Sequence, residues 1–287
     1  MIRTILTPLT GGENSESAGE AAARVARAFN SHLIGLHVRA DPAAAVPFIA
    51  DGLTADIVQE LVSSAEREGD KRSARAREIF DRICAHHDIP LKPADPQATA
   101  PSAEWLERQG IIGDTVGRLA RIADLTVVPQ PAVDVDPMTA SLLDDVLSRS
   151  GRAIMMAPRA LPERFAESVL IAWNGSAEAA RAVADAMAFI TRAKTVIVLT
   201  VGELKAERPD GGALAHSLRC HGVEPELMQA ASGGGGVGAT ILEAAASTGA
   251  SLLILGAYSH SRWREFMLGG VTRLVIEKAP LPVLMSH

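Results

Sequence analysis

Short apolar runs alternate with alanine-rich stretches of helical periodicity from one end of the chain to the other. Residues 2–9 predict a buried strand that ends at a glycine turn, residues 16–29 predict a helix, and residues 32–38 predict a second strand. A stretch rich in Glu, Arg and Ala lies between residues 50 and 87 and predicts helix, with Gly69 as a candidate break into two helices. This alternation of strand and helix indicates an α/β fold.

The rest of the chain continues the alternation. Residues 88–109 hold four prolines and predict a short edge strand. The other predicted helices span residues 114–122, 141–150, 177–193, 214–221, 237–247 and 271–279. The other predicted strands span residues 125–128, 153–156, 168–173, 195–201, 224–229, 251–255 and 283–285.

The order of elements in the second part of the chain repeats the order in the first, as an internal duplication would. The aligned pairs include Ile5 with Val169, Val38 with Val201, and Ile154 with Val283. The first copy is longer in its middle, where its long helical region lies. We therefore predict two tandem open parallel-sheet domains, residues 1–160 and residues 161–287, with right-handed crossover connections.

Each copy should end in a short apolar strand at the edge of its sheet. Exposed edges of this kind pair with other chains unless they are covered. We therefore expect the two last strands to pack together, so that the domains form an intramolecular pseudo-dimer. A homodimer of the whole chain stays an alternative.

Composition narrows the class of protein. Hydrophobic residues make up 47% and charged residues 22% of the 287 residues, which is typical of a globular protein. The formal net charge of -6 argues against nucleic acid or an anionic membrane as a partner. No apolar run approaches the roughly 18 residues that a membrane span needs. Cys84 and Cys220 form no C-x-x-C pair, so we expect a reducing, cytoplasmic location.

One segment carries recognisable chemistry, and it follows the strand predicted at 251–255. Gly256 ends this strand, Ser259 follows, and after nine more residues Gly269 and Gly270 precede a helix. Small residues let backbone N–H groups approach an anion, and a helix N-terminus adds unpaired donors and partial positive charge. Thr272 adds a hydroxyl. The candidate cations for phosphate are Arg262, Arg264 and Arg273.

This segment resembles the nucleotide loop of the universal stress protein family, G-x-x-G-(nine residues)-G-[S/T]. The segment from Ile171 to Ser176 is similar to the family's V-A-x-D-G-S, and residues 279–284 resemble its H-x-P-C-P-V-L ending. The resemblance covers nearly the whole chain in two passes and implies a Rossmann-like, adenine-nucleotide-binding fold of the tandem type. The nucleotide-binding residues that it implies are Ala172, Trp173, Asn174, Val201, Gly256, Ser259, Gly269, Gly270, Val271 and Thr272.

The chain departs from the family pattern at several of these positions. Ser259 stands in place of the second glycine, Gly270 in place of Ser/Thr, and Asn174 in place of Asp. Trp173 either lines the adenine or fills the interior face of its strand. The first copy has the sequence Pro-Gln-Pro at 129–131 and no glycine there, so we expect the nucleotide in the second domain alone.

The resemblance implies an adenine nucleotide, ATP in the first instance, with Mg²⁺ as an accompanying ion, in a stress-response protein. We find no arrangement of residues for catalysis, so we favour binding as a sensor or regulatory element over turnover. A ligand-free interaction module and a slow nucleotide hydrolase stay open as alternatives. His86 and His87 adjoin a predicted helix end without a carboxylate at ligand spacing, so we predict no metal site there.

Overall fold

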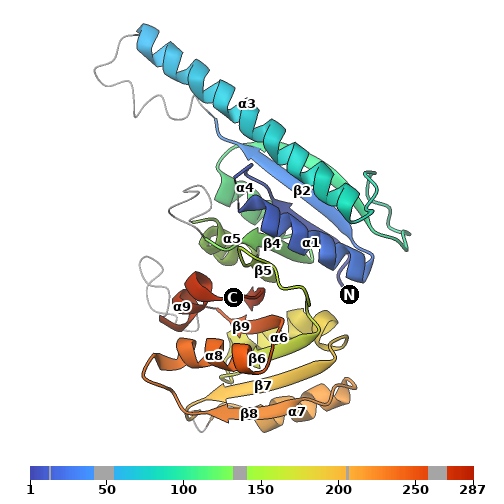
Figure 1. The fold of residues 1–287 in the computed structure, drawn as a ribbon, viewed down its shortest axis with the longest axis vertical. Helices are drawn as coiled ribbons and strands as arrows, with labels where there is room; N and C mark the ends of the chain where they lie inside the picture. Colours follow the sequence, from blue (N-terminus) through green and yellow to red (C-terminus); the bar gives the residue numbers. More distant parts are fainter. Residues whose placement is uncertain (13, 42–54, 132–140, 205–206, 258–269) are drawn as a thin grey trace.

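The structure is a computed structural model that describes all residues except 13, 42–54, 132–140, 205–206 and 258–269. Ten strands form one sheet in the order β3-β2-β1-β4-β5-β10-β9-β6-β7-β8. All neighbouring strands are parallel except β5 and β10, which pair antiparallel at the centre. The predicted α/β class is confirmed, and the two parallel sheets join into one (Figure 1).

The helices and strands of the N-terminal half alternate as predicted. They are β1 (Thr4–Pro8), α1 (Ser15–Phe29), β2 (His32–Arg39), α3 (Ala55–His86), β3 (Ser102–Gln109), α4 (Ile112–Ala120), β4 (Leu125–Pro129), α5 (Leu142–Ser150) and β5 (Ile154–Ala157).

The C-terminal half repeats this order. Its elements are β6 (Ser168–Ala172), α6 (Ala177–Ile190), β7 (Thr195–Val201), α7 (Gly211–Cys220), β8 (Glu226–Ala230), α8 (Gly236–Ser247), β9 (Leu252–Gly256), α9 (Gly270–Lys278) and β10 (Val283–Ser286). The predicted alignment of the two copies is confirmed, because β1 and β6, β2 and β7, and β5 and β10 start at corresponding positions.

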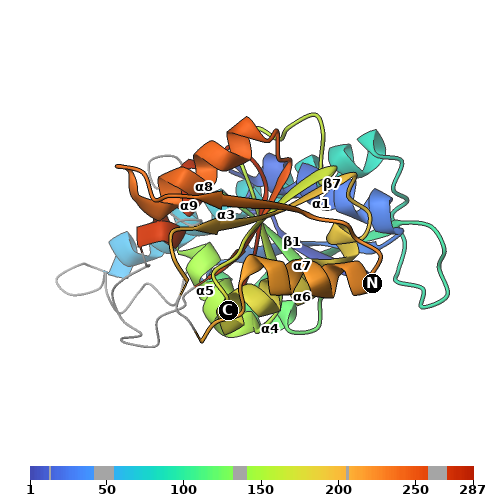
Figure 2. The same cartoon turned by 90° about the horizontal axis from the view of Figure 1, so that it is seen from below.

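Helices cover both faces of the sheet. One core cluster joins the sheet to α1, α3, α6 and α7, and the other joins it to α4, α5, α8 and α9. Seen from below, α8 and α9 lie above the strands of the C-terminal half, while α6 and α7 lie beneath them (Figure 2). The central strands are buried on both faces, which explains their continuous Val, Ile and Leu runs.

The long helix α3 corrects the expectation of a break at Gly69. Helix α3 runs unbroken from Ala55 to His86, and its N-terminal part extends beyond the sheet (Figure 1). A glycine inside a helix costs only about 1 kcal/mol relative to alanine. Phe80 is fully buried on the same helix and anchors it against Gly35 of β2, so packing outweighs this cost. The predicted edge strand is confirmed as β3, which pairs with β2 over eight residues.

The two halves meet through their last strands, as predicted. Met155 of β5 pairs with Leu284 of β10, and both side chains are fully buried. The Phe29 and Phe189 rings meet edge to face at a centroid distance of 5.0 Å and join α1 to α6. No helix among the described residues is both long enough and apolar enough to cross a membrane.

Candidate functional site

The candidate site lies where strand order reverses in the C-terminal half. The chain passes from β6 to β7 on one side and later returns as β9 on the other side of β6. Ligands of open α/β sheets bind beyond the carboxyl ends of strands at such a point. Ala172 pairs with Leu255 of β9 and Leu199 of β7, so the predicted residues at the ends of β6, β7 and β9 lie together.

The turn after β6 is held by its own polar groups. The Asn174 Oδ1 atom accepts a hydrogen bond from the Ser176 backbone N–H at 3.1 Å, and Gly175 has a φ of 65°. Ser176 caps α6, because its Oγ atom accepts from the Ala179 N–H at 3.2 Å. The side-chain carbonyl of Asn174 therefore shapes the turn, a role that an Asp carboxylate fills equally well.

A segment that sequence reasoning missed lies over this turn. The Trp173 indole N–H donates to the carbonyl oxygen of Pro209 at 2.9 Å and to that of Asp210 at 3.1 Å. The Arg208 Nη1 atom donates to the Asn174 carbonyl at 3.2 Å. The positively charged guanidinium of Arg208 therefore lies next to the turn after β6, at the edge of the candidate site. Only an aspartate before a Gly-Gly pair, typical of a helix start, marks this segment in the sequence.

Trp173 belongs to the core. It is 6% exposed and packs in the cluster that joins the sheet to α6 and α7. Of the two interpretations open from the sequence, filling of the interior face fits this burial better. Val201 at the end of β7 is half-buried, and Asn174 is exposed.

Gly256 lies against the first turn of α6. A Cβ atom at this position would stand 2.4 Å from the Ala179 backbone nitrogen and 2.7 Å from the Glu178 carbonyl carbon. Side-chain carbons do not approach backbone atoms this closely, so only glycine fits here. Packing alone therefore accounts for the first glycine of the loop.

Glu178 lies in the first turn of α6, against Gly256. Burial raises the pKa of Glu178, but hydrogen bonds from its own backbone N–H and from Ser176, together with the charges of Arg181 and His287, lower it by more in sum. The net effect is a pKa below the ordinary value. The Arg181 guanidinium lies 3.1 Å from this carboxylate and offsets its charge.

The start of α9 provides the helix N-terminus that the loop predicts. Gly270 is exposed, and no atom of the described residues lies within 4 Å of the position that a Cβ would take. Val271 is half-buried and Thr272 is buried. Arg273 pairs with Glu277 at 2.8 Å, so it is engaged within its own helix. The predicted residues Ser259 and Gly269, together with Arg262 and Arg264, lie outside the described residues.

The corresponding region of the N-terminal half is filled by protein. Helix α3 covers the turn after β1, where a Cβ on Gly11 would stand 2.6 Å from the Arg72 carbonyl oxygen. Beyond β4, the buried Gln130 Nε2 atom donates to the Ile276 carbonyl at 2.8 Å and to the Ala279 carbonyl at 3.3 Å. The first copy thus uses its loop to hold the C-terminal end of α9.

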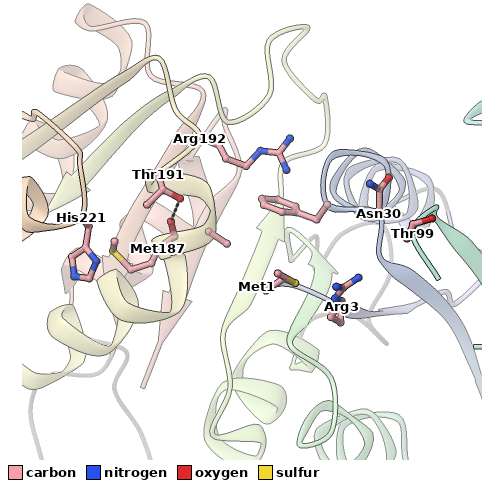
Figure 3. Close-up of a pocket in the computed structure, with 10 residues that line it drawn as sticks. Met1, Arg3, Asn30, Thr99, Met187, Thr191, Arg192 and His221 are labelled. Carbon is pink, nitrogen blue, oxygen red and sulfur yellow. Dashed lines mark hydrogen bonds between the residues drawn. The ribbon is translucent and has the colours of Figure 1, made fainter. Parts of the chain in front are cut away.

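A separate groove of about 640 Å³ lies between the halves (Figure 3). Its walls include Arg3 and Asn30 from the N-terminal half and Met187 and Arg192 from the C-terminal half. The Arg192 guanidinium lies 4.7 Å from the centre of the Phe29 ring. Of the predicted nucleotide residues that the structure describes, none lines this groove.

The strand order and the helices on both faces of the sheet define a doubly wound α/β fold. Residues 166–287 match the sequence model of the universal stress protein family. No curated protein matches the chain in sequence.

Solved structures extend the likeness in fold to the whole chain. A universal stress protein from Archaeoglobus fulgidus DSM 4304 has a TM-score of 0.69 and 14% identity, covering 99% of this chain and 97% of that chain. A functionally unknown protein from Pseudomonas aeruginosa PAO1 has a TM-score of 0.50 and 14% identity, covering 99% of this chain and 92% of that chain. A universal stress protein in complex with cAMP has a TM-score of 0.37 and 22% identity, covering 55% of this chain and 99% of that chain.

Proposed function

We propose that the C-terminal half binds an adenine nucleotide, ATP in the first instance, as a sensor or regulatory element of a stress response. The observation that carries this proposal is the family match over residues 166–287, which includes the whole of the G-x-x-S-(nine)-G-G segment. The phosphates would meet the start of α9, and the base and ribose would lie between Asn174 and Val201.

The described residues support this orientation. Gly270 at the N-terminal end of α9 is exposed, and among the described residues no atom lies within 4 Å of its Cβ position, so its backbone can be reached by an anion. Arg208 adds a positive charge at the rim of the site. Trp173 is buried, so we assign it to support of the site, with its indole edge held by Pro209.

We further propose that residues 1–160 are a second domain of the same kind that has lost its nucleotide site. The cover of α3 over Gly11 and the contacts of Gln130 with α9 leave backbone and side-chain atoms where the ligand would go. The chain would then hold one nucleotide within an intramolecular pseudo-dimer.

We favour binding over turnover, with Mg²⁺ as the ion that accompanies the bound phosphates. Hydrolysis needs a positioned base or metal-bound carboxylate. Glu178 is tied to its own helix start and to Arg181, so it is engaged structurally. A slow hydrolase would release phosphate above background and lose that activity in Gly269→Val. A ligand-free module would show no binding at all.

Calorimetric titration with adenosine, AMP, ADP and ATP tests the proposal. Charge-assisted hydrogen bonds contribute roughly 1.5–3 kcal/mol each, so two phosphate contacts should make ATP bind about a hundredfold more tightly than adenosine. Gly269→Val should abolish ATP binding, while the matched first-copy change Ala140→Val should leave it intact. Equal affinities for adenosine and ATP, or loss of binding in Ala140→Val alone, would overturn the assignment.

A further inference from the structure

Two helices bring three metal-binding side chains together on the N-terminal half, far from the candidate nucleotide site. They are Glu20 of α1, His86 at the last residue of α3, and His87, which follows it. The carboxylate and imidazole ligand atoms all lie within 4.8 Å of one another. From the sequence we predicted no metal site at the two histidines, because the Glu20 carboxylate is 67 residues away from His87 and lies beside it only in the fold.

The geometry of the pair His86–His87 favours convergence on one ion. Neighbouring residues in a helix point about 100° apart. Helix α3 ends at His86, the His87 N–H still donates to the Ile83 carbonyl at 3.0 Å, and the backbone turns at Asp88, which has a φ of 51°. The His86 and His87 rings lie at a centroid distance of 5.0 Å and an angle of 87°. The His87 Nε2 atom already lies 2.6 Å from the Glu20 Oε2 atom.

The surroundings suit a cation. The cluster lies at the C-terminal end of a 32-residue helix, where the helix dipole is negative. Two arginines of α1 are already hydrogen-bonded to backbone carbonyls: Arg27 donates to the His87 carbonyl at 2.8 Å, and Arg24 donates to the Pro162 carbonyl at 2.7 Å. His87 and Glu20 are only 16% and 25% exposed, so their positions are held by packing.

We propose that Glu20, His86 and His87 bind a divalent transition-metal ion such as Zn²⁺. Two imidazoles and one carboxylate suit Zn²⁺, Co²⁺, Ni²⁺ or Cu²⁺, whereas Mg²⁺ and Ca²⁺ prefer oxygen ligands alone. Two ligand atoms on a tetrahedral ion with bonds of about 2.0–2.1 Å lie about 3.3 Å apart. The His87 Nε2 and Glu20 Oε2 atoms, which are 2.6 Å apart, would therefore separate slightly, while the His86 ring would move closer to them. His86 is exposed at the helix end and is free to make this adjustment. The ion would link α1 to the C-terminal end of α3 and leave a coordination position for water.

The competing explanation is a hydrogen-bonded pair of Glu20 and His87, with His86 as a bystander. The decisive variant is therefore His86→Ala. Because His86 is exposed, its loss should leave the metal-free protein folded, with an unchanged thermal midpoint. Under our proposal His86→Ala removes a metal ligand and weakens metal binding, whereas under the competing explanation it leaves metal binding unchanged. His216→Ala on α7 is the matched control, because His216 is also exposed and lies on the other half.

The experiment titrates tag-free, full-length protein with Zn²⁺ by calorimetry and with Co²⁺ by visible absorption. We expect the protein to bind one ion per chain. His86→Ala and Glu20→Gln should each weaken metal binding at least tenfold to hundredfold, because the loss of a residue that only supports a ligand already weakens binding by that factor. His216→Ala should bind like the unmodified protein. The proposal is overturned if the unmodified protein binds neither ion, if His86→Ala binds as tightly as the unmodified protein, or if His216→Ala is the variant that loses binding.

Discussion

Replacement of Gly256 by alanine separates the packing role of this glycine from a role in ligand binding. The added methyl group would stand 2.4 Å from the Ala179 nitrogen, whereas ordinary contacts begin at 3.4 Å. The obstacle is backbone, so the first turn of α6 must move away from β9 by about 1 Å. Overpacking of this kind costs about 1–3 kcal/mol. Loss of the Ser176 cap on Ala179 would add about 1 kcal/mol more.

The assay is thermal unfolding of the full-length protein without nucleotide. Each kcal/mol lost should lower the midpoint by roughly 2–4 °C in a protein of this size. Gly270→Ala is the matched control, because in the described part of the chain no atom lies within 4 Å of its Cβ position, and its midpoint should stay unchanged or rise slightly. A Gly256→Ala midpoint equal to that of the unmodified protein would refute the argument, and the glycine would then owe its place to a ligand alone.

Three further predictions concern other parts of the molecule. Gln130→Ala should lower stability by about 1–3 kcal/mol in urea unfolding, because the carbonyls of Ile276 in α9 and of Ala279 just after it lose their side-chain donor; an unchanged midpoint would contradict this. Burial raises the pKa of the Cys84 thiol to about 12, so a thiol reagent at mildly alkaline pH should modify the exposed Cys220 and reach Cys84 only after unfolding; fast modification of both in the folded protein would refute this. The pKa of Glu178 is lower in the folded protein than its ordinary 4.5, so its contribution to stability is present above that pH and is lost as pH falls through the folded value. The stability difference between Glu178→Gln and the unmodified protein should therefore shrink below pH 4.5, and a constant difference in unfolding midpoints would count against the shift.

The order of elements and the pairing of the halves were predictable because both rest on local patterns. Buried parallel strands appear as unbroken apolar runs, and the duplicated order fixed the correspondence of β1 with β6 and of β5 with β10. The packing of β5 against β10 was predictable because two short apolar strands at sheet edges must be covered, whereas their antiparallel direction came from the structure alone. The predicted break at Gly69 was wrong, because the free energy that a glycine costs inside a helix is smaller than the stabilisation from packing of residues such as Phe80.

The contacts that decide the sites were not predictable, because they join residues far apart in the chain. Arg208 reaches the Asn174 carbonyl across 34 residues, and His87 meets Glu20 across 67. Gln130 reaches Ile276 across 146 residues. The sequence periodicity reports which face of an element is buried, but it does not report which polar side chain of another element meets it. These contacts therefore become visible only in the assembled fold.

The Gln130 contact indicates how the two copies came to differ in use. Its amide holds the C-terminal end of α9, while the N-terminal end of the same helix, at Gly270, is the proposed phosphate contact. A loop that bound a phosphate in the first copy would have to leave this position, because one segment cannot meet both α9 and a ligand. The Pro-Gln-Pro sequence removes two backbone donors and supplies a side-chain donor that points across the interface. The divergence of the first copy thus supports the helix on which the proposed site of the second copy depends.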